Sequence, residues 1–111
     1  MAEHTIMILK TGPNECKVWP PYLLVKGGPG GANSPDRVTW LNKTQGDVIL
    51  DFWNGAVFAD GAKLRSQVIP PGQSHQVTVH ANPPAGRHTY SIFCEETKTR
   101  AIGNSEPELD V

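Results

Sequence analysis

The side chains in this sequence that are best suited to chemistry are two cysteines and four histidines. The cysteines, Cys16 and Cys94, lie far apart in the chain and form no Cys-x-x-Cys pair. The histidines all precede the second cysteine and are His4, His75, His80 and His88. Thiolate and imidazole are the ligands that copper and zinc prefer in proteins. A metal site is therefore the first chemistry to test against the spacing of these residues.

The spacing of the histidines supports only a weak metal site. His88 has the same strand parity as Cys94, but about 20 Å of extended chain would separate the two side chains. His80 and His88 flank a predicted turn and could approach each other across it. Two imidazoles alone fall short of the ligand set that a stable metal site uses.

The two cysteines are predicted to be free thiols. The N-terminal residues Met1-Ala2-Glu3-His4 have neither the basic start nor the apolar stretch of a secretory signal. We therefore expect a cytoplasmic protein, or a periplasmic one if a leader was removed. A sparse pair of cysteines in a cytoplasmic chain is typical of free, buried thiols, whereas a secreted chain would allow one disulfide between Cys16 and Cys94.

Catalytic motifs are missing from the sequence. It contains no nucleophile elbow, no His-Glu-x-x-His and no glycine pattern that cradles a phosphate. A reactive thiol at Cys94 would need a nearby cation to stabilise its thiolate, and Lys98 and Arg100 are close in sequence. We expect a protein that is not an enzyme, with a redox-sensing thiol as one alternative.

The composition indicates one globular domain spanning residues 1–111. The chain is 38% hydrophobic and has a net charge of −1, and a chain of this length can bury enough surface to fold without a disulfide or a metal. There is no basic run to bind phosphates, so we expect no nucleic-acid partner. No apolar stretch approaches the roughly 20 residues of a membrane helix, so we expect no membrane insertion.

Short runs with a hydrophobic period of two, each ended by Gly, Pro, Asn or Asp, predict strands joined by turns. The predicted strands are His4–Leu9, Tyr22–Val25, Asp36–Asn42, Val48–Phe52, Ser74–His80, Arg87–Cys94 and Glu108–Val111, and Ser66–Ile69 leads into a turn. The side chains expected to point inward are Val38, Trp40, Val48, Leu50, Phe52, Val77, Val79, Tyr90, Ile92 and Cys94. Residues 56–65 are expected to hold a turn or a short helix. The pattern predicts an all-β sandwich or barrel of about seven or eight strands.

Four segments, in order, resemble the cupredoxin family of small Greek-key sandwiches, which includes the blue copper proteins. They are Asp36–Asn42 (DRVTWLN), Ile69–Ser74 (IPPGQS), Ala85–Cys94 (AGRHTYSIFC) and Gly103–Val111 (GNSEPELDV). They resemble, respectively, the family's Val-x-Trp-x-Asn strand, its Pro-Gly-x-Ser turn, its strand that ends in Cys, and its closing strand. The resemblance implies a cupredoxin-like Greek-key fold.

The same resemblance implies that the copper site of the family is not encoded in full. A blue-copper site needs one Cys thiolate, two His nitrogens and usually a weak axial Met or Gln. Cys94 stands at the family's cysteine position, but residues 95–111 contain no His, Met or Gln. The position of the first histidine falls on Asp47 or Val48. We therefore expect no cofactor and no bound metal, with a variant copper site that draws on Cys94, Asp47, His80 and His88 as the alternative.

Aromatic residues beside prolines mark a candidate interaction surface. Trp19 and Tyr22 flank Pro20 and Pro21, and Trp53 ends a predicted strand. Tryptophan and tyrosine are enriched at binding hot spots. The leading hypothesis is a non-catalytic binding or assembly module, with an unknown protein partner or a second copy of the chain bound there. The alternatives are a metal-binding or electron-transfer protein and a redox-sensing thiol protein.

Overall fold

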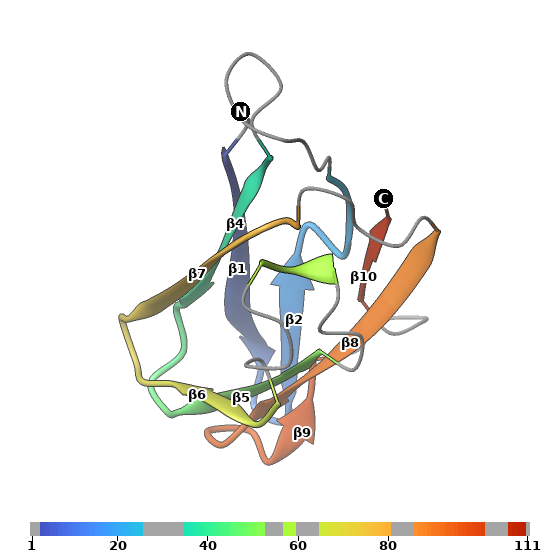
Figure 1. The fold of residues 1–111 in the computed structure, drawn as a ribbon. Coiled ribbons are helices and arrows are strands. Elements are labelled where there is room, and N and C mark those ends of the chain that lie inside the picture. The colour runs from blue at the N-terminus through green and yellow to red at the C-terminus, as the bar shows by residue number, and fades with distance from the viewer. Residues whose placement is uncertain are drawn as a thin grey trace.

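The computed structural model describes residues 3–25, 35–52, 57–59, 65–80, 86–101 and 107–110. In these residues ten strands form two sheets that pack into a sandwich (Figure 1). The strands are β1 Glu3–Gly12, β2 Glu15–Trp19, β3 Tyr22–Leu24, β4 Arg37–Asn42, β5 Val48–Phe52, β6 Gln67–Ile69, β7 Ser74–Thr78, β8 Arg87–Cys94, β9 Thr99–Arg100 and β10 Glu108–Asp110.

The chain crosses several times between the two sheets. One sheet, called the β4 sheet, has the order β2-β1-β4-β7, and the other, called the β8 sheet, has the order β3-β10-β8-β5-β6 with β9 on β8. The pairs β1–β4 and β3–β10 are parallel, and the other pairs are antiparallel. The all-β sandwich expected from the sequence is confirmed, with ten strands among the described residues where about seven or eight were expected.

The core lies between the sheets, as the alternation of apolar residues predicts. All ten side chains expected to point inward are buried. Four aromatic rings form the centre of this core: Trp40, Phe52, Phe58 and Tyr90. Trp40 meets Tyr90 edge to face at 5.6 Å, an arrangement that the charge distribution of aromatic rings favours.

Two strands are absent from the prediction, and one of them matters for the site. Strand β2 forms a hairpin with β1, in which Lys10 lies opposite Cys16. It buries only Cys16 and Val18, between exposed Glu15 and Lys17, so its alternation is too short to stand out. Strand β9 has two residues. The sequence alone therefore does not indicate where Cys16 lies in the fold.

The turn or short helix expected in residues 56–65 lies mostly outside the described residues. Within it, Phe58 is buried and forms an isolated bridge with Val79. In the described ranges, no helix is long and apolar enough to cross a membrane.

Candidate functional site

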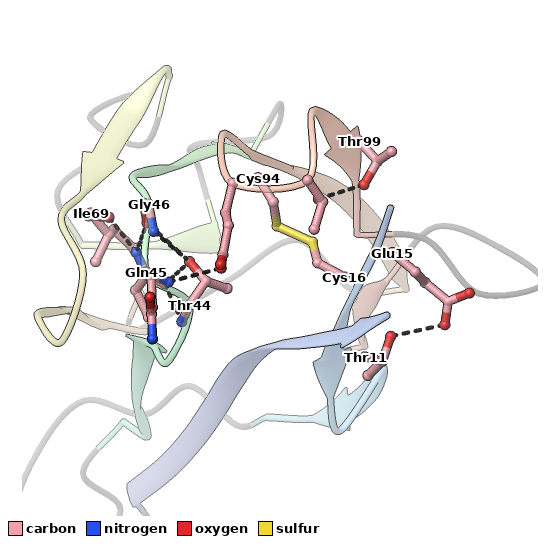
Figure 2. Close-up of a disulfide and its surroundings, with 12 residues drawn as sticks. Thr11, Glu15, Cys16, Thr44, Gln45, Gly46, Ile69, Cys94 and Thr99 are labelled. Atoms are coloured by element: carbon pink, nitrogen blue, oxygen red, sulfur yellow. Dashed lines mark hydrogen bonds between the residues drawn. A yellow bond between two sulfur atoms is a disulfide. The ribbon is translucent and has the colours of Figure 1, made fainter. Parts of the chain in front are cut away.

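Cys16 and Cys94 form a disulfide, which corrects the prediction of two free thiols (Figure 2). Their Cα atoms are 6.8 Å apart. Cys16 lies on β2 of the β4 sheet and Cys94 ends β8 of the β8 sheet, so the bond ties the two layers together. The prediction is wrong because β2, which brings Cys16 to Cys94, is not visible in the sequence pattern.

The cross-strand neighbour of Cys94 is Val48 on β5. Both side chains are fully buried. Asp47 is exposed, and its backbone oxygen accepts a hydrogen bond from the Glu95 amide at 2.9 Å. Of the two positions that the sequence left open for the family's first histidine, the one beside Cys94 on the inner face is therefore Val48, an alkyl side chain.

The chain leaves Cys94 through a tight polar turn, residues 95–98, before β9 turns back along β8. The Lys98 ammonium lies 2.9 Å from a Glu95 carboxylate oxygen. Thr97 is buried, and its hydroxyl lies 2.7 Å from that of Thr99. The side chains of this turn are carboxylate, hydroxyl and ammonium groups.

A second turn, residues 43–46, faces the first and is held by Asn42. The Asn42 side chain is fully buried, and its amide donates to the backbone oxygens of Gly46 and Ile69, both at 2.8 Å. Its oxygen accepts hydrogen bonds from the amide and the hydroxyl of Thr44. Because all the polar atoms of this side chain are paired, its burial is compensated. Figure 2 shows Thr44, Gly46 and Ile69 in this network beside the disulfide.

Glu96 connects the two turns. One carboxylate oxygen accepts the Gln45 amide at 3.0 Å, and the other lies 3.3 Å from the Lys10 ammonium. The hydrogen bond from the Gln45 amide, helped by Lys10 and opposed by desolvation, lowers the pKa of Glu96 below its ordinary value. A Cβ at Gly46 would lie 2.9 Å from the Glu96 backbone nitrogen. The two turns are therefore in direct contact at the Cys94 end of the sandwich.

His4, His80 and His88 lie away from this end. His88 is opposite Leu109 on β10, and His80 follows β7. The His4 Nε2 atom lies 2.8 Å from a carboxylate oxygen of the buried Asp36. Across the part of the chain that the structure describes, no three His, Cys, Asp or Glu side chains are grouped to hold a metal. The set Cys94, Asp47, His80 and His88 is thus not brought together there.

The predicted interaction residues are exposed where the structure describes them. Trp19 is 62% exposed and Tyr22 is 51% exposed, while Trp53 lies outside the described residues. Leu24, which the sequence analysis did not single out, is 55% exposed on β3. We call Trp19, Tyr22 and Leu24 the 19–24 segment. The sequence pattern does not indicate the exposure of Leu24, because β3 is only three residues long and is too short to show an alternation of buried and exposed side chains.

Trp19 also extends a row of apolar side chains across the outer face of the β4 sheet. Its cross-strand neighbour is Met7, and the neighbour of Met7 on the other side is Leu41. Residues directly opposite each other in a sheet lie on the same face. Met7 and Leu41 are only half-buried, so the row is open to contact.

The chain was compared with known proteins. No protein-family model matches the sequence, and no curated protein matches it. Among solved structures, the reduced state of an amicyanin mutant matches with a TM-score of 0.56 and 21% identity, over 98% of this chain and 81% of that chain. The reduced Cu(I) form of a second amicyanin mutant gives the same values. At this identity the likeness concerns the fold, and the chain has the all-β, two-sheet cupredoxin-like fold.

Proposed function

We propose that this chain is a non-catalytic binding or assembly module, built on a cupredoxin-like sandwich that does not hold blue copper. One observation carries the proposal: the cysteine at the family's copper-ligand position, Cys94, is bonded to Cys16. A disulfide sulfur has no thiolate to offer a metal.

The other residues around Cys94 do not fit a blue-copper ion either. The site would need two imidazoles beside the thiolate. Val48 supplies an alkyl group at one position, and the turn of residues 95–98 supplies no imidazole or thioether at the others. The contact between Gly46 and Glu96 also closes the two turns against each other. Reduction of the disulfide would restore the thiolate but none of these missing ligands.

The 19–24 segment supports a binding role. Large aromatic and apolar side chains that remain exposed are typical of interaction sites. In this segment Trp19, Tyr22 and Leu24 all expose half or more of their surface. The partner expected there is a protein, either another polypeptide or a second copy of this chain.

Copper titration tests the proposal. Cu(II) is added to the oxidised protein, to the reduced protein and to a Cys16→Ala variant in which Cys94 is a free thiol. We expect no intense band near ~600 nm in any of the three, because the imidazole ligands of such a site are missing. An intense band, or stoichiometric copper that is lost in a Cys94→Ala variant, would overturn the proposal in favour of a variant metal site.

Self-association tests the binding surface. Sedimentation velocity over a range of concentrations is recorded for Trp19→Ser and Leu24→Ser, with Val68→Ser as the matched control. Val68 is a 47% exposed apolar residue on β6, at the opposite edge of the β8 sheet. If a second copy is the partner, the first two variants shift the protein towards monomer and the control does not. An equal effect of all three variants would contradict a specific surface at the 19–24 segment.

A further inference from the structure

We propose that the Cys16–Cys94 disulfide forms before the chain has folded completely and is then buried between the two sheets of the sandwich. The chain is on this basis a substrate of a thiol-oxidising reaction and acts in an oxidising compartment. This inference is independent of the proposed binding role, and the copper titration does not decide it.

The first step of the argument is the burial of the two sulfur-bearing residues. Cys16 is 1% exposed and Cys94 is 0% exposed, and both belong to the hydrophobic core. Disulfides form and break when a thiolate attacks a sulfur atom, so the rate depends on access to that atom. A folded sandwich gives an external thiol no such access.

The second step is what covers the bond. On the Cys94 side, the buried Val48 lies opposite Cys94, and the chain after β9 stays paired with β8 through the amide of the buried Ala101, which donates to the Ile92 oxygen at 2.8 Å. On the Cys16 side, β2 is hydrogen-bonded along β1. Exposing the bond therefore requires strands to separate, which couples exchange at the sulfur atoms to unfolding.

The third step is the chemistry of formation. The two thiols lose two protons and two electrons, one S–S bond forms, and a disulfide-bearing oxidant takes up the electrons and protons and becomes a dithiol. The sequence has 2 cysteines, so no third thiol of the chain can start the exchange from within. An external oxidant must meet the cysteines before the sheets close over them.

The compartment follows from the same chemistry. Glutathione and thioredoxin keep the thiols of a cytoplasmic chain reduced while it folds, whereas secreted and periplasmic chains are oxidised. A bond that links β2 to the end of β8 must form between residues separated by 78 positions, early enough to precede burial. We therefore place the chain in an oxidising compartment, in line with the periplasmic alternative rather than the cytoplasmic expectation.

Reduction kinetics test the buried state of the bond. The oxidised protein is incubated with millimolar dithiothreitol at increasing urea, quenched with acid, and its thiols are counted by the mass shift with a maleimide-polyethylene glycol. We expect the logarithm of the reduction rate to rise with urea along the same slope as the logarithm of the unfolding equilibrium constant measured by tryptophan fluorescence, because a reaction slower than refolding follows the population of the unfolded state. Fast reduction in the absence of urea would overturn the proposal.

A core variant away from the disulfide sharpens this test. Leu50 is fully buried on β5 opposite Ile92. Leu50→Ala should accelerate reduction by the same factor as it raises the equilibrium constant of global unfolding. A higher unfolding equilibrium constant without faster reduction would show that a local opening exposes the bond, and would contradict the proposal.

Thiol trapping in the source cells tests the compartment. Cells are quenched with acid, and the protein is alkylated with the maleimide reagent before and after reduction. We expect no modification until the disulfide is reduced, and then two modifications per chain. Two modifications per chain before reduction, in the acid-denatured protein, would overturn the assignment to an oxidising compartment.

Discussion

Removing the disulfide should cost a large part of the stability of the fold. The bond closes a loop across a sequence separation of 78, and the loop-entropy relation for such a loop gives about 4.5 kcal/mol at 25 °C. Domains of this size have a free energy of unfolding of roughly 5–15 kcal/mol. We expect the double substitution Cys16→Ala with Cys94→Ala to lower the free energy of unfolding by about 3–5 kcal/mol.

Urea unfolding followed by tryptophan fluorescence measures this loss. Because the uncrosslinked chain is more expanded when unfolded, the slope of the free energy against urea should also rise. The reduced wild-type protein is the matched control, since it loses the bond but keeps both sulfur atoms in the core. A loss below about 1 kcal/mol in both proteins would refute the reasoning that the bond restrains the unfolded chain.

Four further predictions concern the three residues Tyr90, Gly46 and Glu96. Tyr90→Phe should leave the free energy of unfolding unchanged or raise it by about 1 kcal/mol, because the buried hydroxyl has no hydrogen-bond partner within the described residues. A loss above that size in urea unfolding would show that the hydroxyl is bonded. Burial raises the pKa of Tyr90 and outweighs the opposing effect of the Trp40 side chain. The free energy of unfolding should therefore fall as the pH rises above the ordinary value of 10.0, and Tyr90→Phe should remove that part of the fall. Gly46→Ala should lower the free energy of unfolding by about 1–3 kcal/mol in the same assay, because the new Cβ would lie 2.9 Å from the Glu96 nitrogen. Gly12→Ala is the control and should lower it less, because its Cβ would lie 3.6 Å from its nearest neighbour. Equal losses would contradict a close contact between the turns. Because the pKa of Glu96 is lowered, its carboxylate contributes to the free energy of unfolding above the ordinary value of 4.5, and this contribution is lost as the pH falls through the lowered pKa. Glu96→Gln should therefore flatten the acid side of the plot of stability against pH. An unchanged acid side would argue against the contact with Gln45.

The layers and the core could be predicted from the sequence because they depend on local alternation. Val38 and Trp40 on one strand, and Tyr90 and Ile92 on another, are spaced so that each pair must share a face. The same parity predicts that Val48 points inward, and the structure places it opposite Cys94. The partnering of the strands, such as the parallel pair of β1 and β4, is a long-range property that no local pattern carries.

The disulfide could not be predicted for the same reason. Cys16 reaches Cys94 only because β2 pairs with β1 across a short hairpin and the β4 sheet then packs on the β8 sheet. Because the charged residues of β2 mask its alternation, the sequence does not indicate that the two cysteines are neighbours. The closed contact between the two turns depends likewise on Gly46 and Glu96 meeting across the fold.

The exposed residues of the 19–24 segment were partly predictable. Trp19 and Tyr22 stood out because prolines flanked by aromatic residues keep the chain extended at the edge of a sheet. Their exposure is found in the structure, whereas a partner at this surface stays a prediction. Leu24 was missed because a strand of three residues shows no period that separates its inner side chain from its outer ones.

A peptide map under non-reducing conditions tests the central claim most directly. Trypsin cleaves after Lys10, Lys17, Arg87 and Lys98, so the cysteines fall in peptides 11–17 and 88–98. With free thiols blocked before digestion, we expect one linked species with the summed mass of these peptides, which separates on reduction. Recovery of the two peptides as separate, blocked thiols would contradict the claim that Cys94 is committed to a disulfide rather than to a metal.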